Sequence, residues 1–152
     1  MNKKLLAASF ALALGAGFTL NAVAQVKPET MVKQRQAAMT LQGKYWGPLG
    51  GMAQGKVPYD ASVVARNAGF LEALSKMPWD GFNASTQGEK TAALPEVWKD
   101  AAGFKAAIDK FEGEVGKLVA AAKGGNEAAI KAQLGEVGKT CGGCHEKFRE
   151  KR

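Results

Sequence analysis

The chain has 152 residues, of which 46% are hydrophobic and 23% charged, and this composition is typical of one globular domain. Its 21 lysines and arginines exceed its 14 acidic residues, but the net charge of +7 has no basic cluster behind it that would indicate nucleic-acid binding. Two cysteines and one histidine are one ligand too few for a zinc site built from these residue types alone. The histidine lies seven residues from the C-terminus, which disfavours a Ser/His catalytic triad.

Residues 1–24 have the pattern of a secretory signal peptide. Two lysines precede an apolar run from Leu5 to Leu20, and Ala22-Val23-Ala24 is the small-x-small pattern cut by signal peptidase. The alternative is a membrane anchor, but the segment has no stop-transfer flank. We expect cleavage before Gln25, which leaves residues 25–152 as one domain of net charge +5 with no membrane attachment. The short basic signal indicates export to the oxidising bacterial periplasm.

Four segments of the remaining chain are predicted to be amphipathic helices, and the first two have clear end signals. One begins at Pro28 and runs to Trp46, where Gly47-Pro48 is expected to end it. The next follows Asp60 as N-cap and stops before Pro78. Their predicted inward-facing residues are Met31, Arg35, Ala38, Met39, Gln42 and Trp46, followed by Val63, Val64, Asn67, Phe70, Leu71 and Leu74.

The last two segments carry apolar residues at steps of three and four. The third helix is predicted from Trp98 to Ala122, after a short turn at Pro95. The fourth follows Asn126 as N-cap and continues to Phe148. No segment alternates with the period of two that a sheet requires. The sequence therefore predicts an all-α fold, an antiparallel up-down-up-down four-helix bundle.

Cys141-Gly142-Gly143-Cys144-His145 is the C-x-x-C-H motif of covalent haem attachment. Residues three and four apart share one face of a helix, so both thiols and the imidazole can address one flat ligand. The thiols would form thioethers with the two vinyl groups of haem c, while His145 binds the iron from one side. We therefore expect one covalently attached haem.

Other uses of the two cysteines remain open. A dithiol switch of the thioredoxin kind would lie at the start of a helix in a βαβ pattern, but Cys141 and Cys144 lie at the end of the last helix. A structural disulfide is compatible with an oxidising compartment, but it leaves His145 on the same face unexplained. A zinc site lacks ligands.

The single histidine restricts the other axial position of the iron. No second histidine exists in this chain, so the strong candidates for a sixth ligand are Met31, Met39, Met52 and Met77. Met39 lies on the inward face of the first helix, one turn after Arg35, where it could cover the open side of the iron. The alternative is that Met39 fills the core, as methionines in apolar stripes usually do.

Taken together, these segments resemble the cytochrome c′ family, the class II c-type cytochromes, over essentially the whole mature chain. Besides the C-terminal haem motif, the resemblance rests on Arg35-Gln36-Ala37-Ala38-Met39, Pro58-Tyr59-Asp60, Pro78-Trp79-x-x-Phe82, Pro95-Glu96-Val97-Trp98 and Phe148-Arg149. The segment from Phe82 to Pro95 departs most from the family in length, so the resemblance assigns no specific contact to it.

The resemblance implies a four-helix bundle that forms a homodimer through its first two helices. It implies that His145 is the only protein ligand of a high-spin, five-coordinate iron and that Met39 blocks the distal face. The roles implied for the other residues are propionate binding by Arg35 and Gln36, a basic contact beside the proximal histidine from Arg149, and lining of the pocket by Trp79 and Phe82. The family also has low-spin relatives in which a methionine at the position of Met39 binds the iron.

Three functions follow from these observations. The leading hypothesis is a periplasmic haem protein that binds nitric oxide and carbon monoxide, since a crowded apolar distal face admits small uncharged ligands. Its physiological role would be nitric oxide sequestration or tolerance, without enzymatic activity. The second hypothesis is a low-spin electron-transfer cytochrome with Met39 as ligand and a basic surface for acidic redox partner proteins. The third is a dithiol oxidoreductase without haem.

Overall fold

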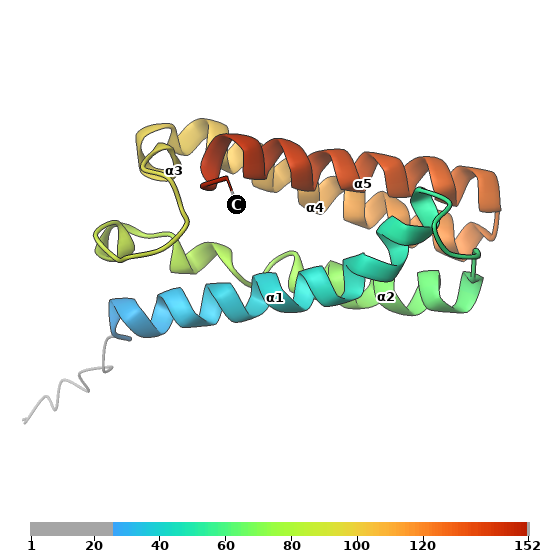
Figure 1. Ribbon diagram of the computed structural model, residues 1–152, viewed down its shortest axis with the longest axis horizontal. Coiled ribbons are helices and arrows are strands. Elements are labelled where there is room, and N and C mark those ends of the chain that lie inside the picture. Colours follow the sequence, from blue (N-terminus) through green and yellow to red (C-terminus); the bar gives the residue numbers. More distant parts are fainter. Residues whose placement is uncertain (1–25, 152) are drawn as a thin grey trace, which may run out of the picture.

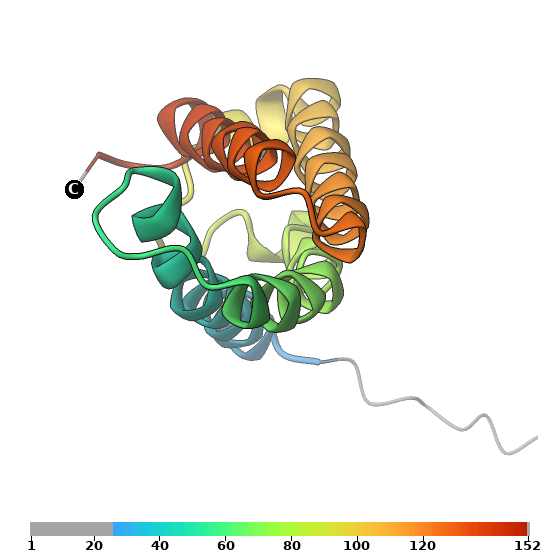
Figure 2. The ribbon, with the colours of Figure 1, turned by 90° about the vertical axis from the view of Figure 1, so that its right-hand side faces the viewer.

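The computed structural model describes residues 26–151, so the expected signal peptide, residues 1–24, lies outside the described part. The described chain is all-helical, and its four long helices form an antiparallel bundle, which confirms the predicted architecture (Figure 1). The end view shows these helices arranged around a common axis (Figure 2). The elements are α1 (Pro28–Ala53), α2 (Ala61–Leu74), η1 (Trp79–Gly81), η2 (Ala84–Thr86), α3 (Glu96–Lys99), α4 (Ala101–Gly124) and α5 (Glu127–Phe148).

The predicted N-caps of α2 and α5 are both confirmed. The Asp60 carboxylate accepts hydrogen bonds from the backbone N–H groups of Ser62 and Val63, at 2.9 and 3.1 Å. The Asn126 side chain accepts one from the backbone N–H of Ala129 at 2.9 Å. These bonds satisfy helix N–H groups that have no partner within the helix.

The predicted end of α1 at Gly47-Pro48 is wrong. The helix continues to Ala53 with Pro48 in its interior, and Figure 1 shows this C-terminal part turning toward α5. Proline removes one helix hydrogen bond and favours a bend, but Leu49 and Met52 just beyond it are buried in the core. Tertiary packing of these side chains outweighs the local stop signal.

The predicted third helix is divided into two. The short turn expected at Pro95 is α3, and Asp100 separates it from α4. The Asp100 carboxylate accepts a hydrogen bond from the Gly103 backbone N–H at 2.9 Å and so caps a new helix. Trp98 therefore belongs to α3, with its indole donating to the Asn83 carbonyl at 3.1 Å.

Two hydrophobic clusters form the core. The larger one fills the end of the bundle near the α4–α5 turn and includes Val64, Leu71, Val115 and Leu134. The smaller one consists of Val97, Phe104 and Phe148 and lies near α3. Trp79 packs against both clusters.

The predicted inward position of Phe70 is wrong. Its side chain is 44% exposed and lies against the Tyr45 ring, with ring centroids 4.6 Å apart. The adjacent Leu71 takes the inward position because Val64, Ala68 and Leu71 form the buried stripe of α2. Within residues 26–151, no helix combines the length and apolarity needed to cross a membrane.

Candidate functional site

A cavity of about 650 Å³ lies between α1 and α5 and borders both hydrophobic clusters. Its volume falls within the range of small-molecule and cofactor sites. All nine residues singled out from the sequence line it: Arg35, Gln36, Met39, Trp79, Phe82, Cys141, Cys144, His145 and Arg149. They come from α1, from the connection after α2 and from the end of α5, so the fold joins segments more than 100 residues apart.

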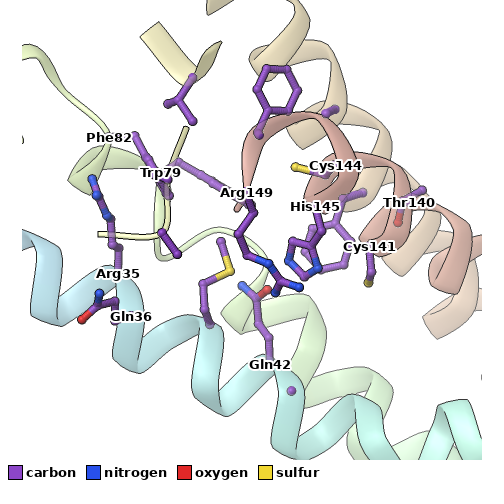
Figure 3. A pocket seen from close by; sticks show the side chains of 18 of the residues that line it. Arg35, Gln36, Gln42, Trp79, Phe82, Thr140, Cys141, Cys144, His145 and Arg149 are labelled. Carbon is purple, nitrogen blue, oxygen red and sulfur yellow. The ribbon is translucent and has the colours of Figure 1, made fainter. Parts of the chain in front are cut away.

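The C-x-x-C-H motif lies in the last two turns of α5. Cys141 packs against the larger cluster and Cys144 against the smaller one, with His145 beside them in the cavity wall (Figure 3). The α-helical backbone through the motif gives the spacing of three and four residues that brings these side chains to one face. This geometry fits a flat ligand held at two points and contacted by an imidazole.

Both cysteines are free thiols rather than a disulfide. Burial raises the pKa of the Cys141 thiol to about 11. Burial also raises the pKa of Cys144, partly offset by the nearby charge of Arg149. Dithiol oxidoreductases need a thiol whose pKa is lowered, so these environments disfavour the dithiol hypothesis.

The α1 wall of the cavity faces this motif. Arg35 and Gln42 are buried in it, Met39 is half-buried, and Gln36 is exposed at the cavity rim. The Gln42 amide donates to the Leu74 carbonyl at 2.9 Å and so ties α1 to the end of α2. Met39 is therefore part of the cavity wall, on the side opposite α5.

Arg35 joins α1 to the connection that follows α2. Arg35 is 3% exposed, and its guanidinium donates to the Gly81 carbonyl and to the hydroxyls of Thr86 and Thr91, the last two at 3.1 and 3.3 Å. The same group lies 4.2 Å from the centre of the Phe82 ring, a cation–π distance. Burial lowers the pKa of Arg35, and attraction to Glu89 opposes that effect.

Arg149 follows α5 and lies beside His145 in Figure 3. Its backbone N–H donates to the His145 carbonyl at 3.1 Å, and it pairs with Ala93 in an isolated antiparallel bridge. The Arg149 Nε atom is buried without a hydrogen-bond partner among the described residues. A buried, unpartnered cationic donor on a cavity wall is suited to a ligand with acceptor oxygens.

Aromatic rings form the end of the cavity nearest α3. Trp79 stacks on Phe82 at 6.3 Å and meets Phe104 and Phe111 edge-on at 6.1 and 6.4 Å. The Trp79 indole also donates to the Glu112 carboxylate at 3.0 Å. These rings provide a broad apolar surface, which suits a macrocycle.

Sequence reasoning missed two residues that organise this region, Thr86 and Thr91. Thr86 is fully buried, and its hydroxyl lies 2.9 Å from both the Gly81 and the Asn83 carbonyl, to either of which it can donate. No local pattern could have found it, because its partner Arg35 lies 51 residues earlier in the chain. Only the packing of the connection against α1 gives Thr86 its role.

The residues present fit a haem. Two thiols and an imidazole share one face of α5, and aromatic rings supply the apolar wall. The buried Arg35 and the half-buried Arg149 line the cavity without an ion pair in the described chain. Haem carries carboxylate side chains that can accept from such cations. Within residues 26–151, no three His, Cys, Asp or Glu side chains form a site for a bare metal ion.

Comparisons with known proteins agree with this assignment. The family model described as Cytochrome C' matches residues 30–149. Cytochrome c' of Rubrivivax gelatinosus is 51% identical over 126 residues, covering 82% of this chain and 98% of the relative. Its 1.3 Å crystal structure matches with a TM-score of 0.77, at 50% identity over 82% of this chain and 98% of that one.

A nitric oxide complex of a variant of cytochrome c prime from Alcaligenes xylosoxidans matches with a TM-score of 0.76. The two chains are 39% identical, and the match covers 84% of this chain and 99% of the other. The chain therefore belongs to the cytochrome c′ family, and its Cys141 and Cys144 can hold the covalently bound haem c of that family.

Proposed function

We propose that this protein is a periplasmic haem protein whose five-coordinate, high-spin iron binds nitric oxide and carbon monoxide, and that it sequesters nitric oxide. The observation that carries the proposal is the composition of the cavity wall. The only histidine of the chain, His145, lies on the α5 side, and the facing α1 wall contributes the half-buried Met39. A nitric oxide complex is known for a variant of a relative, and that variant is 39% identical to this chain.

Each residue has a proposed role at the haem. Cys141 and Cys144 hold it by thioethers, each formed when a thiol adds across a vinyl group and its hydrogen passes to the other vinyl carbon. His145 provides the axial nitrogen, and Arg149 lies beside it. The bound iron supplies the position at which a diatomic gas coordinates.

The remaining roles concern the periphery of the haem. Arg35 and Gln36 are proposed to bind the propionates. The buried Arg35 guanidinium forms no ion pair among the described residues, so a propionate would add a directly contacting counter-charge to the attraction from Glu89. Trp79 and Phe82 line the apolar part of the pocket. The function is ligand binding, and none of these roles is catalytic.

An absorption spectrum of the reduced, haem-loaded protein, recorded with and without carbon monoxide, tests this function. We expect a high-spin spectrum without the gas and a clear change when it is added. An identical spectrum in its presence would contradict gas binding. Mass spectrometry of the periplasmic fraction tests the rest, with a chain starting at Gln25 and carrying one haem as the expected result.

The second candidate is a low-spin electron-transfer cytochrome, and the presence of Met39 in the cavity wall favours it. A thioether there is the one strong iron ligand on the α1 side of the cavity. A Met39→Leu substitution separates the two candidates because leucine fills similar space without a ligand atom. We expect the spin state of the resting iron to be unchanged by Met39→Leu. Conversion from low to high spin would establish ligation and the electron-transfer function.

We also propose a homodimer through α1 and α2. These helices and the residues just after them expose Leu41, Phe70 and Met77, at 41%, 44% and 56%. Leu41 and Met77 border one groove on this face. Burial of such a patch in a second copy removes apolar surface from water.

Sedimentation velocity of the double variant Leu41→Asp/Phe70→Asp tests the dimer. We expect a dimeric wild-type protein and a monomeric variant, because burying two carboxylates is costly. Val57→Asp is the matched control, since Val57 is 43% exposed but lies outside both helices. A variant as dimeric as the control would contradict this interface.

A further inference from the structure

The cavity meets solvent along one side of α1. Among the residues that line it, only Gln36, Thr40 and Gly43 are exposed, whereas the others are buried or half-buried. Their spacing of four and three residues puts them on one side of the helix. A residue that both lines a cavity and reaches solvent marks an opening, so this stripe is the mouth of the cavity.

Gly43 is the smallest residue of the mouth. A Cβ atom added to it would have no neighbouring heavy atom within 4 Å, so the space above its backbone is open. Met39 lies one turn before Gly43 and Trp46 lies three residues after it, and both line the cavity. Gly43 therefore leaves a gap in the α1 wall between two large side chains.

Trp46 is held in place on its side of this gap. Its indole packs so closely against Gly50 and Gly138 that a Cβ atom on either glycine would lie 3.1 or 3.2 Å from the ring. The ring thus bridges the last part of α1 and α5. Because its surroundings fix Trp46, the width of the gap depends on the residue at position 43.

We propose that diatomic ligands enter the cavity over Gly43, between Met39 and Trp46, and that the missing side chain at this position sets their rate of entry. The inference rests on the proposed gas-binding function. The proposed dimer leaves this route open, because Ala37 and Leu41, which border the groove on the dimer face, lie on the opposite side of α1 from Gly43.

Flash photolysis of the carbon monoxide complex of the haem-loaded protein tests this route. The test variant is Gly43→Phe. Gly47→Phe is the matched control, because Gly47 is exposed one turn further along α1, also has an unobstructed Cβ position, and does not line the cavity. Both variants replace an exposed glycine of α1 with the same residue. Because Gly47 precedes Pro48, whose ring disfavours helical backbone in a preceding residue with a Cβ atom, any loss of helix stability should be at least as large in the control.

We expect Gly43→Phe to lower the association rate constant about tenfold, which corresponds to ~1.4 kcal/mol in the entry barrier. The dissociation rate constant should fall by the same factor, because a barrier to entry changes neither end state. Affinity and the spectrum should therefore stay constant, and Gly47→Phe should change neither rate. The same two glycine variants are also measured in combination with Met39→Ala. In these double variants, dissociation of Met39 from the iron cannot limit the association rate.

Equal association rates for the Gly43→Phe and Gly47→Phe variants, with Met39 present or replaced, would overturn the proposed route. A changed affinity or resting spectrum in Gly43→Phe would also overturn it, because residue 43 would then act on the iron site itself. Failure of the wild-type protein to bind carbon monoxide would instead contradict the gas-binding function and, with it, the entry route.

Discussion

Thr86 is a single buried hydroxyl that organises one end of the cavity. It lies among the Gly81 and Asn83 carbonyls and the Arg35 guanidinium, and it is fully buried. Without this hydroxyl, buried donors and acceptors would lose a partner that water could not easily replace. Thr86 therefore stabilises both the connection after α2 and the position of Arg35.

We expect Thr86→Val, which preserves the shape of the side chain, to lower the free energy of unfolding by about 1–3 kcal/mol. Chemical denaturation of the haem-loaded protein measures the change. Thr86→Ser retains the hydroxyl and should lose much less stability. If the two variants had the same free energy of unfolding, the hydrogen bonds of the Thr86 hydroxyl would contribute nothing measurable to stability.

The motif residues and the threonines differ in how far local sequence specifies them. Cys141, Cys144 and His145 are recognisable because their spacing alone encodes a shared helix face. Thr86 and Thr91 have no such signal, since their common partner Arg35 lies on a different helix. Local spacing can predict contacts within a helix, but contacts between distant segments need the folded chain.

At the level of elements, Asp100 links α4 to α5. Its carboxylate caps α4 through the Gly103 N–H, and it also accepts from the Lys147 ammonium on α5 at 2.5 Å. The hydrogen bond from Lys147 is the largest cause of its lowered pKa, followed by the bond from Gly103. The same residue therefore starts one helix and connects it to the helix that carries the haem motif.

This lowered pKa predicts how stability depends on pH. A carboxylate whose pKa is lower in the folded state stabilises that state above its unfolded value, near 3.8, and the contribution is lost as the pH falls through the folded pKa. Asp100→Asn should therefore give a shallower loss of thermal stability between pH 5 and about pH 2. Melting curves across this range measure it.

Lys147→Gln is the companion variant for this pH experiment. It removes the first cause of the lowered pKa while keeping the cap to Gly103. Its acid dependence should fall between those of the wild-type protein and Asp100→Asn. Three curves of equal steepness would show that the Asp100 link does not govern acid stability.

Helix boundaries show where local signals are overruled. Pro48 is a strong stop signal, yet α1 continues past it because Leu49 and Met52 are buried in the core. Asp100 has the opposite effect, dividing a segment whose apolar periodicity looks continuous. Periodicity predicts that helices exist, but caps and packing set their ends.

At the level of the whole molecule, the cavity separates the larger hydrophobic cluster from the smaller one. Trp79 is the residue that packs against both, and the cysteines each border one of them. A haem in this space would join the two clusters into a continuous apolar interior. The stability of the bundle should therefore depend on the cofactor.

The double variant Cys141→Ser/Cys144→Ser, stripped of haem, tests this dependence. We expect a lower and broader thermal transition by circular dichroism than for the haem-loaded protein, because the apolar walls of the cavity become hydrated. Wild-type protein carrying its haem is the reference, and the Cys144→Ser variant with one thioether should lie between the two. An equally sharp transition at the same temperature would show that the bundle needs no cofactor.

The helical class, the N-caps at Asp60 and Asn126 and the C-x-x-C-H motif could be predicted from the amino-acid sequence, because each depends on residues within a few positions of one another. The extension of α1, the hydrogen bonds between Arg35 and Thr86 and the exposure of Gly43 at the cavity could be seen only in the folded chain. These depend on contacts between segments far apart in the chain, whose burial and hydrogen bonding outweigh local preference.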